Sequence, residues 1–290
     1  MNPVYLSTGA FVGKLNGRNW HFPVQFADKL ECDGFEFMIF PDFVDTLSEI
    51  IAEYRAAELK IPVVHARKML GDFVSNPSEE AFTTAKEMVA RDCDAAAQLF
   101  PDGRPKVVAH CWGIPDSDTY FEQICERIGV LREIAASCGV DFLPENSFCV
   151  HGSPLAHFQT LASLYPDLHF IMDTRCAQFH AELTPPREGF SVEGAPSDAL
   201  PTFTASEVFA QRVRHIHIND YAGFYKDWSS MYPILQPPTG KIDWEQFFSV
   251  LRALPYSHSI TLEAPSMKPD TVDYPTLNRS IRFIREHLLP

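Results

Sequence analysis

The chain has 290 residues, of which 46% are hydrophobic and 21% charged, and this ordinary globular composition excludes disordered, collagen-like and coiled-coil classes. Its 24 basic and 38 acidic residues give a net charge of −14, which disfavours a nucleic-acid or membrane-surface partner, because such partners select basic surfaces. No apolar run approaches the ~20 residues that cross a bilayer, and the first residues do not read as a signal peptide. Seven scattered cysteines without a CxxC pair predict a reduced, cytoplasmic protein.

Short β-rich apolar runs recur along the whole chain. Several are nearly continuous in apolar residues, which is typical of parallel strands covered on both faces. The expected strands are Val4–Ser7, Gly34–Ile39, Ile61–His65, Lys106–His110, Val140–Pro144, Leu168–Met172, Val213–Ile218 and Ser259–Leu262.

The stretches between these runs have the spacing of helices. Between Asp45 and Leu59, for example, apolar residues recur at intervals of three and four. The expected helices are Asp45–Leu59, Ala81–Phe100 (preceded by the capping sequence Pro77-Ser78-Glu79-Glu80), Ser117–Cys138, Pro154–Tyr165, Trp244–Ala253 and Tyr274–Leu288.

Strands and helices alternate from end to end, which predicts an α/β fold, a single (β/α)8 TIM barrel over residues 1–290. An open doubly wound sheet would more often carry a GxGxxG loop after its first strand, where this chain has Ser7-Thr8-Gly9-Ala10-Phe11. Two long connections, Thr184–Thr204 and Tyr221–Ile242, follow the sixth and seventh strands, on the face where barrels build active sites. We expect them to be functional lids.

Six successive strands end in a histidine or a carboxylate, and the ends of barrel strands converge on one axis. The residues are His65, His110, Glu145, Asp173, His217 and Glu263. Buried carboxylates gathered in this way repel one another, and each is costly to desolvate. A divalent cation resolves both problems, and oxygen with imidazole ligands suits zinc, manganese, cobalt or iron. His215 shares a strand face with His217 but lies one layer deeper, so we expect it to support the site rather than to bind metal.

These residues resemble the xylose isomerase-like TIM barrels, a superfamily that joins sugar isomerases and epimerases with zinc-dependent AP endonucleases. The resemblance covers nearly the whole chain. It rests on Gly34-Phe35-Glu36-Phe37, the tetrad Glu145, Asp173, His217 and Glu263, the HxxD of His217–Asp220, and Gly240-Lys241-Ile242-Asp243-Trp244.

Resemblance to the epimerase branch implies one divalent metal ion (Zn, Mn or Co) bound by Glu145, Asp173, His217 and Glu263. It also implies that Glu145 and Glu263 exchange protons on either side of a substrate carbon. The predicted function is thus a sugar or polyol isomerase or epimerase with a small sugar-like substrate. The chain departs from that branch at Cys176, where the family usually has a substrate-binding histidine. Barrels of this class often pair, so a homodimer is compatible with the resemblance.

Resemblance to the endonuclease branch adds His65 and His110, which would share Glu145 with a second metal ion. Cys176 replaces one histidine of that branch's third metal, and Tyr221–Ile242 contains no histidine to supply another. The alternative function is therefore a dinuclear metal hydrolase or lyase. DNA is disfavoured as a substrate by the charge of −14. A further alternative is a non-catalytic, metabolite-binding barrel.

Several residues near the strand ends are candidates for substrate contacts. Arg67 and Lys68 follow His65, and Trp112 follows His110. The remaining candidates are Cys176 and Asp220.

Overall fold

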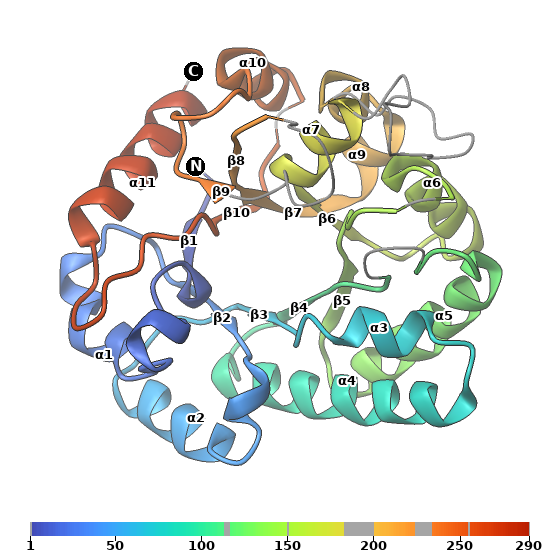
Figure 1. The fold of residues 1–290 in the computed structure, drawn as a ribbon, viewed down its shortest axis with the longest axis horizontal. Coiled ribbons are helices and arrows are strands. Elements are labelled where there is room, and N and C mark those ends of the chain that lie inside the picture. Colours follow the sequence, from blue (N-terminus) through green and yellow to red (C-terminus); the bar gives the residue numbers. More distant parts are fainter. Residues whose placement is uncertain are drawn as a thin grey trace.

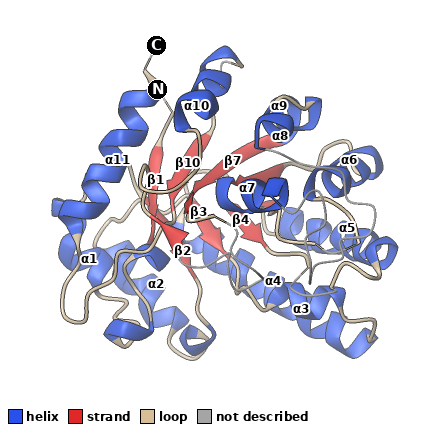
Figure 2. Cartoon of the chain, turned by 45° about the horizontal axis from the view of Figure 1, so that its top comes forward, coloured by secondary structure: helices blue, strands red, loops and turns tan. Residues whose placement is uncertain are grey.

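The structure is a computed structural model that describes residues 2–112, 117–149, 151–182, 200–223, 234–254 and 256–289. Eight strands form one parallel sheet in the spatial order β5-β4-β3-β2-β1-β10-β7-β6. A parallel bridge between Glu145 and Ile171 joins β5 to β6, so the sheet is a nearly closed barrel. The ring of strands lies inside a ring of helices (Figures 1 and 2), which confirms the predicted (β/α)8 fold.

The strands of the barrel are short and buried. They are β1 (Val4–Ser7), β2 (Phe35–Met38), β3 (Val63–His65), β4 (Lys106–Ala109), β5 (Asp141–Pro144), β6 (Phe170–Asp173), β7 (Val213–Ile218) and β10 (Ser259–Leu262). A separate antiparallel pair joins β8 (Asp220–Tyr221) to β9 (Ile234–Leu235). All eight strands predicted from sequence are present, with ends that differ by at most two residues.

Eleven α-helices lie within the described ranges. They are α1 (Phe22–Phe26), α2 (Leu47–Ala56), α3 (Leu70–Ser75), α4 (Glu79–Leu99), α5 (Phe121–Ser137), α6 (Pro154–Leu164), α7 (Thr174–Glu182), α8 (Leu200–Thr204), α9 (Glu207–Arg212), α10 (Trp244–Ala253) and α11 (Tyr274–Leu288). The Ser78 hydroxyl caps α4 by accepting from the amides of Glu80 and Ala81, as its sequence predicts. None of these helices has the length and hydrophobicity that a membrane crossing requires.

The two predicted long connections contain more regular structure than expected. The first, Thr184–Thr204, ends in α8, and its residues 184–199 lie outside the described ones. The second, Tyr221–Ile242, carries the β8–β9 pair, and its residues 224–233 are likewise not described.

Asp220 holds the base of this second connection. Its buried carboxylate accepts hydrogen bonds from the Gly240 amide at 2.8 Å, the Ile242 amide at 3.3 Å and Trp244 Nε1 at 2.9 Å. One side chain thus ties the end of β7 to the start of α10. This is a structural role, and we do not include Asp220 among the substrate contacts for which the sequence made it a candidate.

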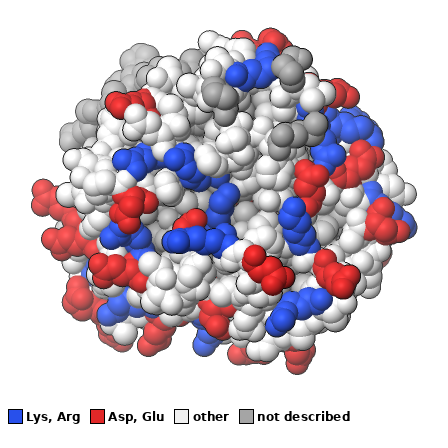
Figure 3. Space-filling view, turned by 180° about the vertical axis from the view of Figure 1, so that it is seen from behind, with Lys and Arg blue, Asp and Glu red and all other residues white. Residues whose placement is uncertain are grey.

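Charge is unevenly distributed over the surface. On the face seen from behind in Figure 3, Lys and Arg side chains gather around the middle, and Asp and Glu side chains lie mostly toward the margin. The net charge of −14 therefore describes the chain as a whole rather than each of its faces.

We expect Asp220→Ala to lower the free energy of unfolding by about 3 kcal/mol, because two buried donors and the half-buried Gly240 amide lose a charged acceptor. Urea denaturation measures this loss. The control is Asp270→Ala at an exposed position, which should change stability little. An Asp220→Ala protein as stable as the control would contradict the structural role.

Candidate functional site

Strand alternation brings four of the predicted site residues into the barrel mouth. A small apolar layer fills the barrel interior and consists of Tyr5, Val63, Val108, Leu143 and Ile171. Side chains two residues apart on a strand share a face. The residues that come two positions after the last four members of this layer are His65, His110, Glu145 and Asp173. They therefore point to the same interior, one layer nearer the carboxyl ends of the strands.

Glu36 on β2 fixes the orientation of His217 on β7 across the barrel interior. Both residues are fully buried, and Nε2 of His217 lies 2.9 Å from the Glu36 carboxylate. Nε2 of His215 lies 2.9 Å from the same carboxylate. Burial alone would raise the pKa of Glu36, but the two imidazoles outweigh it and lower the pKa. An ionised carboxylate only accepts, so Nε2 of His217 donates and Nδ1 faces the mouth.

Two carboxylates flank that Nδ1 atom. Glu145 Oε1 and Glu263 Oε2 each lie 3.7 Å from His217 Nδ1. Burial lowers the pKa of His217, but the charges of Glu36 and Glu263 outweigh burial and raise the pKa above the usual range. The pKa of Glu263 falls to about 2, since Lys68 and His217 more than offset its burial. Lys68 Nζ is 3.2 Å from Glu263 Oε1.

His65 and His110 meet the other side of Glu145. Nε2 of His65 lies 3.4 Å from Glu145 Oε2, and Nε2 of His110 lies 3.0 Å from the same oxygen. Nδ1 of His65 donates to the Ala66 carbonyl at 2.7 Å, which leaves the Nε2 lone pair directed at Glu145. Burial raises the pKa of Glu145, but His110 above all, together with His217, outweighs burial and holds this pKa well below its usual range. The side chain of His110 is 22% exposed, so it connects Glu145 with solvent.

Asp173 is held by backbone and amide groups. Its Oδ1 accepts from the Cys176 amide at 2.7 Å at the start of α7, and its Oδ2 accepts from Asn219 Nδ2 at 2.5 Å. Asn219 also donates to Glu263 Oε2 at 2.7 Å. Burial raises the pKa of Asp173, and the charges of Glu145 and Glu263 raise it further. Each oxygen of Asp173 keeps a second lone pair that a cation could use.

Asn219 is a site residue that the sequence analysis missed. It stands two positions after His217 and four after His215, so the alternation of β7 places all three on one face. That spacing was a readable signal. Arg175, whose charge opposes the rise in the Asp173 pKa, has no comparable signal in the sequence.

The buried atoms of this site match the ligands of a divalent cation. His65 Nε2 and His217 Nδ1 are buried without a hydrogen-bond partner among the described residues. Such orphaned atoms are costly unless something binds them. Three groups hold ligand atoms within 4.8 Å of one another: His65 with His217 and Glu263, His65 with His110 and Glu145, and Glu145 with Asp173 and Cys176. Imidazole nitrogen and carboxylate oxygen suit zinc, manganese or cobalt.

Cys176 lies in the site, but its thiol is poorly suited to nucleophilic chemistry. Burial raises its pKa well above the usual range, and the charge of Asp173 raises it further. A protonated, buried thiol is a weak nucleophile. Cys176 therefore forms part of the site wall, next to Glu145 and Asp173.

The side chains of Arg67 and Trp112 form hydrogen bonds with other parts of the chain. Arg67 is buried, and its guanidinium pairs with Asp92 of α4 at 2.9 Å. Trp112 is fully buried and donates from Nε1 to the Ser147 carbonyl at 3.0 Å. We include neither residue among the proposed substrate contacts, because both side chains are committed to packing and buried hydrogen bonds.

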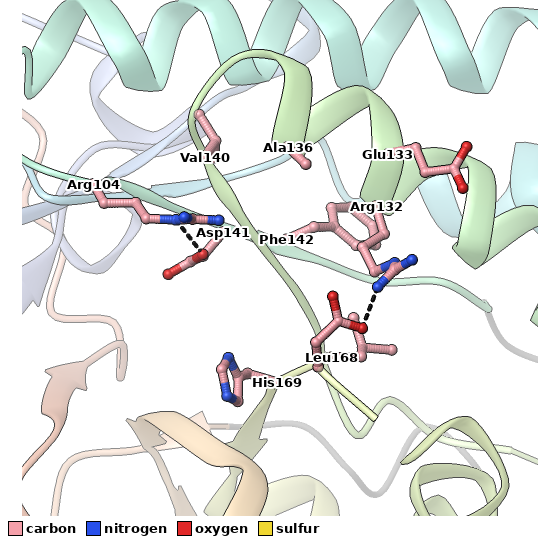
Figure 4. A pocket seen from close by; sticks show the side chains of 10 residues that line it. Arg104, Arg132, Glu133, Ala136, Val140, Asp141, Phe142, Leu168 and His169 are labelled. Atoms are coloured by element: carbon pink, nitrogen blue, oxygen red, sulfur yellow. Dashed lines mark hydrogen bonds and ion pairs between the residues drawn. The ribbon is translucent and has the colours of Figure 1, made fainter. Parts of the chain in front are cut away.

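A small polar pocket of 150 Å³ lies at the opposite ends of β5 and β6 from Glu145 and Asp173 (Figure 4). Its two arginines are paired with carboxylates. Arg104 Nε is 2.6 Å from Asp141, and Arg132 forms an ion pair with Asp167. The charges of this pocket therefore satisfy one another, and the convergent ligand atoms lie at the mouth.

Solved structures share the fold over the full chain. D-Allulose 3-epimerase from Methylomonas sp., in complex with D-allulose, has a TM-score of 0.70 at 12% identity and covers 99% of this chain and 97% of its own. D-Psicose 3-epimerase from Clostridium cellulolyticum H10, with D-tagatose, has a TM-score of 0.67 at 12% identity, with 99% and 100% covered. The 3-keto-D-glucoside 4-epimerase from E. coli has a TM-score of 0.64 at 16% identity, with 99% and 100% covered.

No curated protein sequence matches the chain. The family model described as xylose isomerase-like TIM barrel matches residues 24–287, which is most of the chain. The fold and this match agree with the resemblance that the strand-end residues indicated. The chain belongs to the xylose isomerase-like TIM barrel family.

Proposed function

We propose that the protein is a divalent-metal-dependent isomerase or epimerase of a sugar or sugar-like polyol. The observation that carries this proposal is the pair of carboxylates, Glu145 and Glu263, at equal distances of 3.7 Å from His217 Nδ1. Two carboxylates on either side of one position can remove a proton from a carbon and return it on the other face. Family membership and the sugar epimerases that share the fold support the same reaction class.

Glu263 acts as the base in this proposal. Its pKa of about 2 keeps it ionised at neutral pH, and Lys68 and Asn219 fix its two oxygens. Glu145 returns a proton on the other face. Because the low pKa of Glu145 leaves it ionised at rest, His110, which lies 3.0 Å from Glu145 and reaches solvent, first relays a proton to it. Glu263 passes the proton that it removed to solvent before the next turnover. The assignment of base and acid reverses for the opposite stereoisomer, as an epimerase requires.

Glu145, Asp173, His217 and Glu263 would hold the metal ion. The ion would polarise the carbonyl or hydroxyl oxygen of the substrate and so acidify the neighbouring C–H group. Around it, Glu36 orients His217, and Asn219 bridges Asp173 and Glu263. Lys68 and Cys176 remain the candidates for contacts with the substrate.

A dinuclear hydrolase or lyase is the second candidate, and a specific observation favours it. His65 and His110 both approach Glu145 Oε2, so these three residues could hold a second ion beside the tetrad. A pair of ions with a bridging hydroxide would suit hydrolysis. The metal stoichiometry separates the two candidates.

We expect metal binding to the metal-free protein at pH 7 to release about one proton per ion, and affinity to fall as pH falls. The raised pKa of His217 means that Nδ1 carries a proton until a cation replaces it. Calorimetric titration with MnCl2 in buffers of different ionisation enthalpy measures the release. An observed enthalpy that does not change with the buffer would contradict this assignment.

Glu263→Gln should reduce kcat by at least about 100-fold, because the amide cannot accept the proton. The variant should also lose exchange of the substrate C–H proton with deuterium from D2O, read by NMR. Glu245→Gln, at a side chain that is 75% exposed on α10, is the matched control and should retain full activity. Retained exchange in Glu263→Gln would refute its role as the base.

His110→Ala should leave the metal content at one ion per chain and should slow turnover. If the site holds a single ion, His110 supplies protons rather than binding metal. Elemental analysis of wild type and variant gives the stoichiometry. Two ions in the wild type and one in the variant would instead establish the dinuclear site and overturn the proposed isomerase.

A further inference from the structure

An apolar cavity of 320 Å³ opens beside the carboxylate site. Segments that follow β1, β2, β3 and β10, together with β9, form its wall. The apolar residues that line it include Met38, Phe40, Met69, Ile234, Pro265 and Met267. The cavity volume falls within the range of small-molecule pockets, which begins at about 300 Å³.

Small residues next to the cavity leave space for the methionine side chains of its wall. A Cβ atom added to Gly13 would lie 2.5 Å from the Met267 sulfur, so a larger residue there would displace the end of the methionine side chain. Gly9 likewise allows the close approach of Met38. Met69 is 39% exposed, although an apolar side chain gains nothing from contact with water. Methionine side chains adapt to irregular apolar ligands.

The cavity and the carboxylate site share a border. Among the residues that line the cavity, Lys68 and Glu263 are charged, and they pair with each other at 3.2 Å. The alkyl stem of Lys68 can cover apolar surface while its ammonium group holds Glu263. The polar site thus ends at this ion pair, and the apolar wall begins beyond it. A ligand held by the two carboxylates would extend directly into the cavity.

The chemistry of the wall selects what can occupy it. Sugar hydroxyls need hydrogen-bond partners when they leave water, and methionine, proline, isoleucine and phenylalanine side chains supply none. Aromatic or alkyl groups lose nothing by the same transfer and gain from the removal of apolar surface from water. A free sugar would therefore leave this part of the mouth unused.

We propose that the cavity is a subsite for an apolar substituent, so that the substrate is a sugar joined to an aromatic or alkyl group rather than a free sugar. The proposal rests on the proposed function, since it takes the carboxylate site to hold the sugar. It adds that the substituent occupies the space between Met38, Met69 and Met267.

The test compares two inert glycosides that differ only in the substituent. Isothermal titration of the Mn²⁺-loaded protein with phenyl β-D-glucopyranoside and methyl β-D-glucopyranoside should show at least ~10-fold tighter binding of the phenyl glycoside. Met69→Lys should reduce that preference at least ~5-fold, because it places a charge on the apolar wall. Leu164→Lys, on an exposed apolar residue at the end of α6, is the matched control and should keep the preference.

Met267→Gln provides a second variant, which should also weaken the phenyl preference. Equal affinities for the two glycosides, no binding of either, or a preference that survives both substitutions would overturn the subsite. Turnover of free ketoses alongside equal affinities would retain the proposed function and reject the subsite. A phenyl preference in a protein that epimerises no sugar would retain the subsite and reject the function.

Discussion

The buried carboxylate of Glu36 is the constraint on which the mouth of the barrel depends. It is fully buried among strands, yet it remains ionised because His215 and His217 both approach it at 2.9 Å. The pair of contacts settles which nitrogen of His217 faces the mouth. An apolar residue at position 36 would leave Nε2 of His217 without its acceptor and would free the His217 ring to turn. Glu36, which lies deeper in the barrel than the candidate site, thus sets the orientation of His217 within it.

Side-chain amides, which carry no charge, hold two of the carboxylates of the site in position. Asn219 donates to both Asp173 and Glu263, and Asn146 exchanges two hydrogen bonds with the backbone of Asp173. Neutral donors can hold carboxylates in place without cancelling their charge. The site can therefore keep three carboxylates close together in fixed positions. Preorganisation of this kind is what makes electrostatic sites effective.

The fold and the convergent residues could be predicted because both follow from periodicity. Apolar runs predicted the eight strands, and the polar residues at the ends of those strands predicted His65, His110, Glu145 and Asp173. The contacts of Arg67 and Trp112 could not be predicted in this way. Their partners, Asp92 and the Ser147 carbonyl, come from other segments that only the folded chain brings near.

The short helices were missed for a related reason. The start of α7 depends on Asp173, whose carboxylate accepts from the Cys176 amide and so serves the helix and the site at once. A sequence pattern assigns such a residue a single role. Five- to nine-residue helices such as α1 and α7 also offer too few turns for an apolar stripe to stand out. Asn219 is different, since the alternation of β7 was enough to find it.

The anchoring of the β8–β9 pair has a consequence for how this barrel can diversify. Asp220 pairs with Leu235, Tyr221 pairs with Ile234, and the Asp220 carboxylate is bound to three groups at the start of α10. The two ends of the intervening segment are thus held together independently of what lies between them. Insertions, deletions or exchanges between residues 223 and 234 can accumulate without a change in the position of His217. Natural variation and laboratory recombination can therefore exchange this segment while the barrel that carries the candidate site stays unchanged.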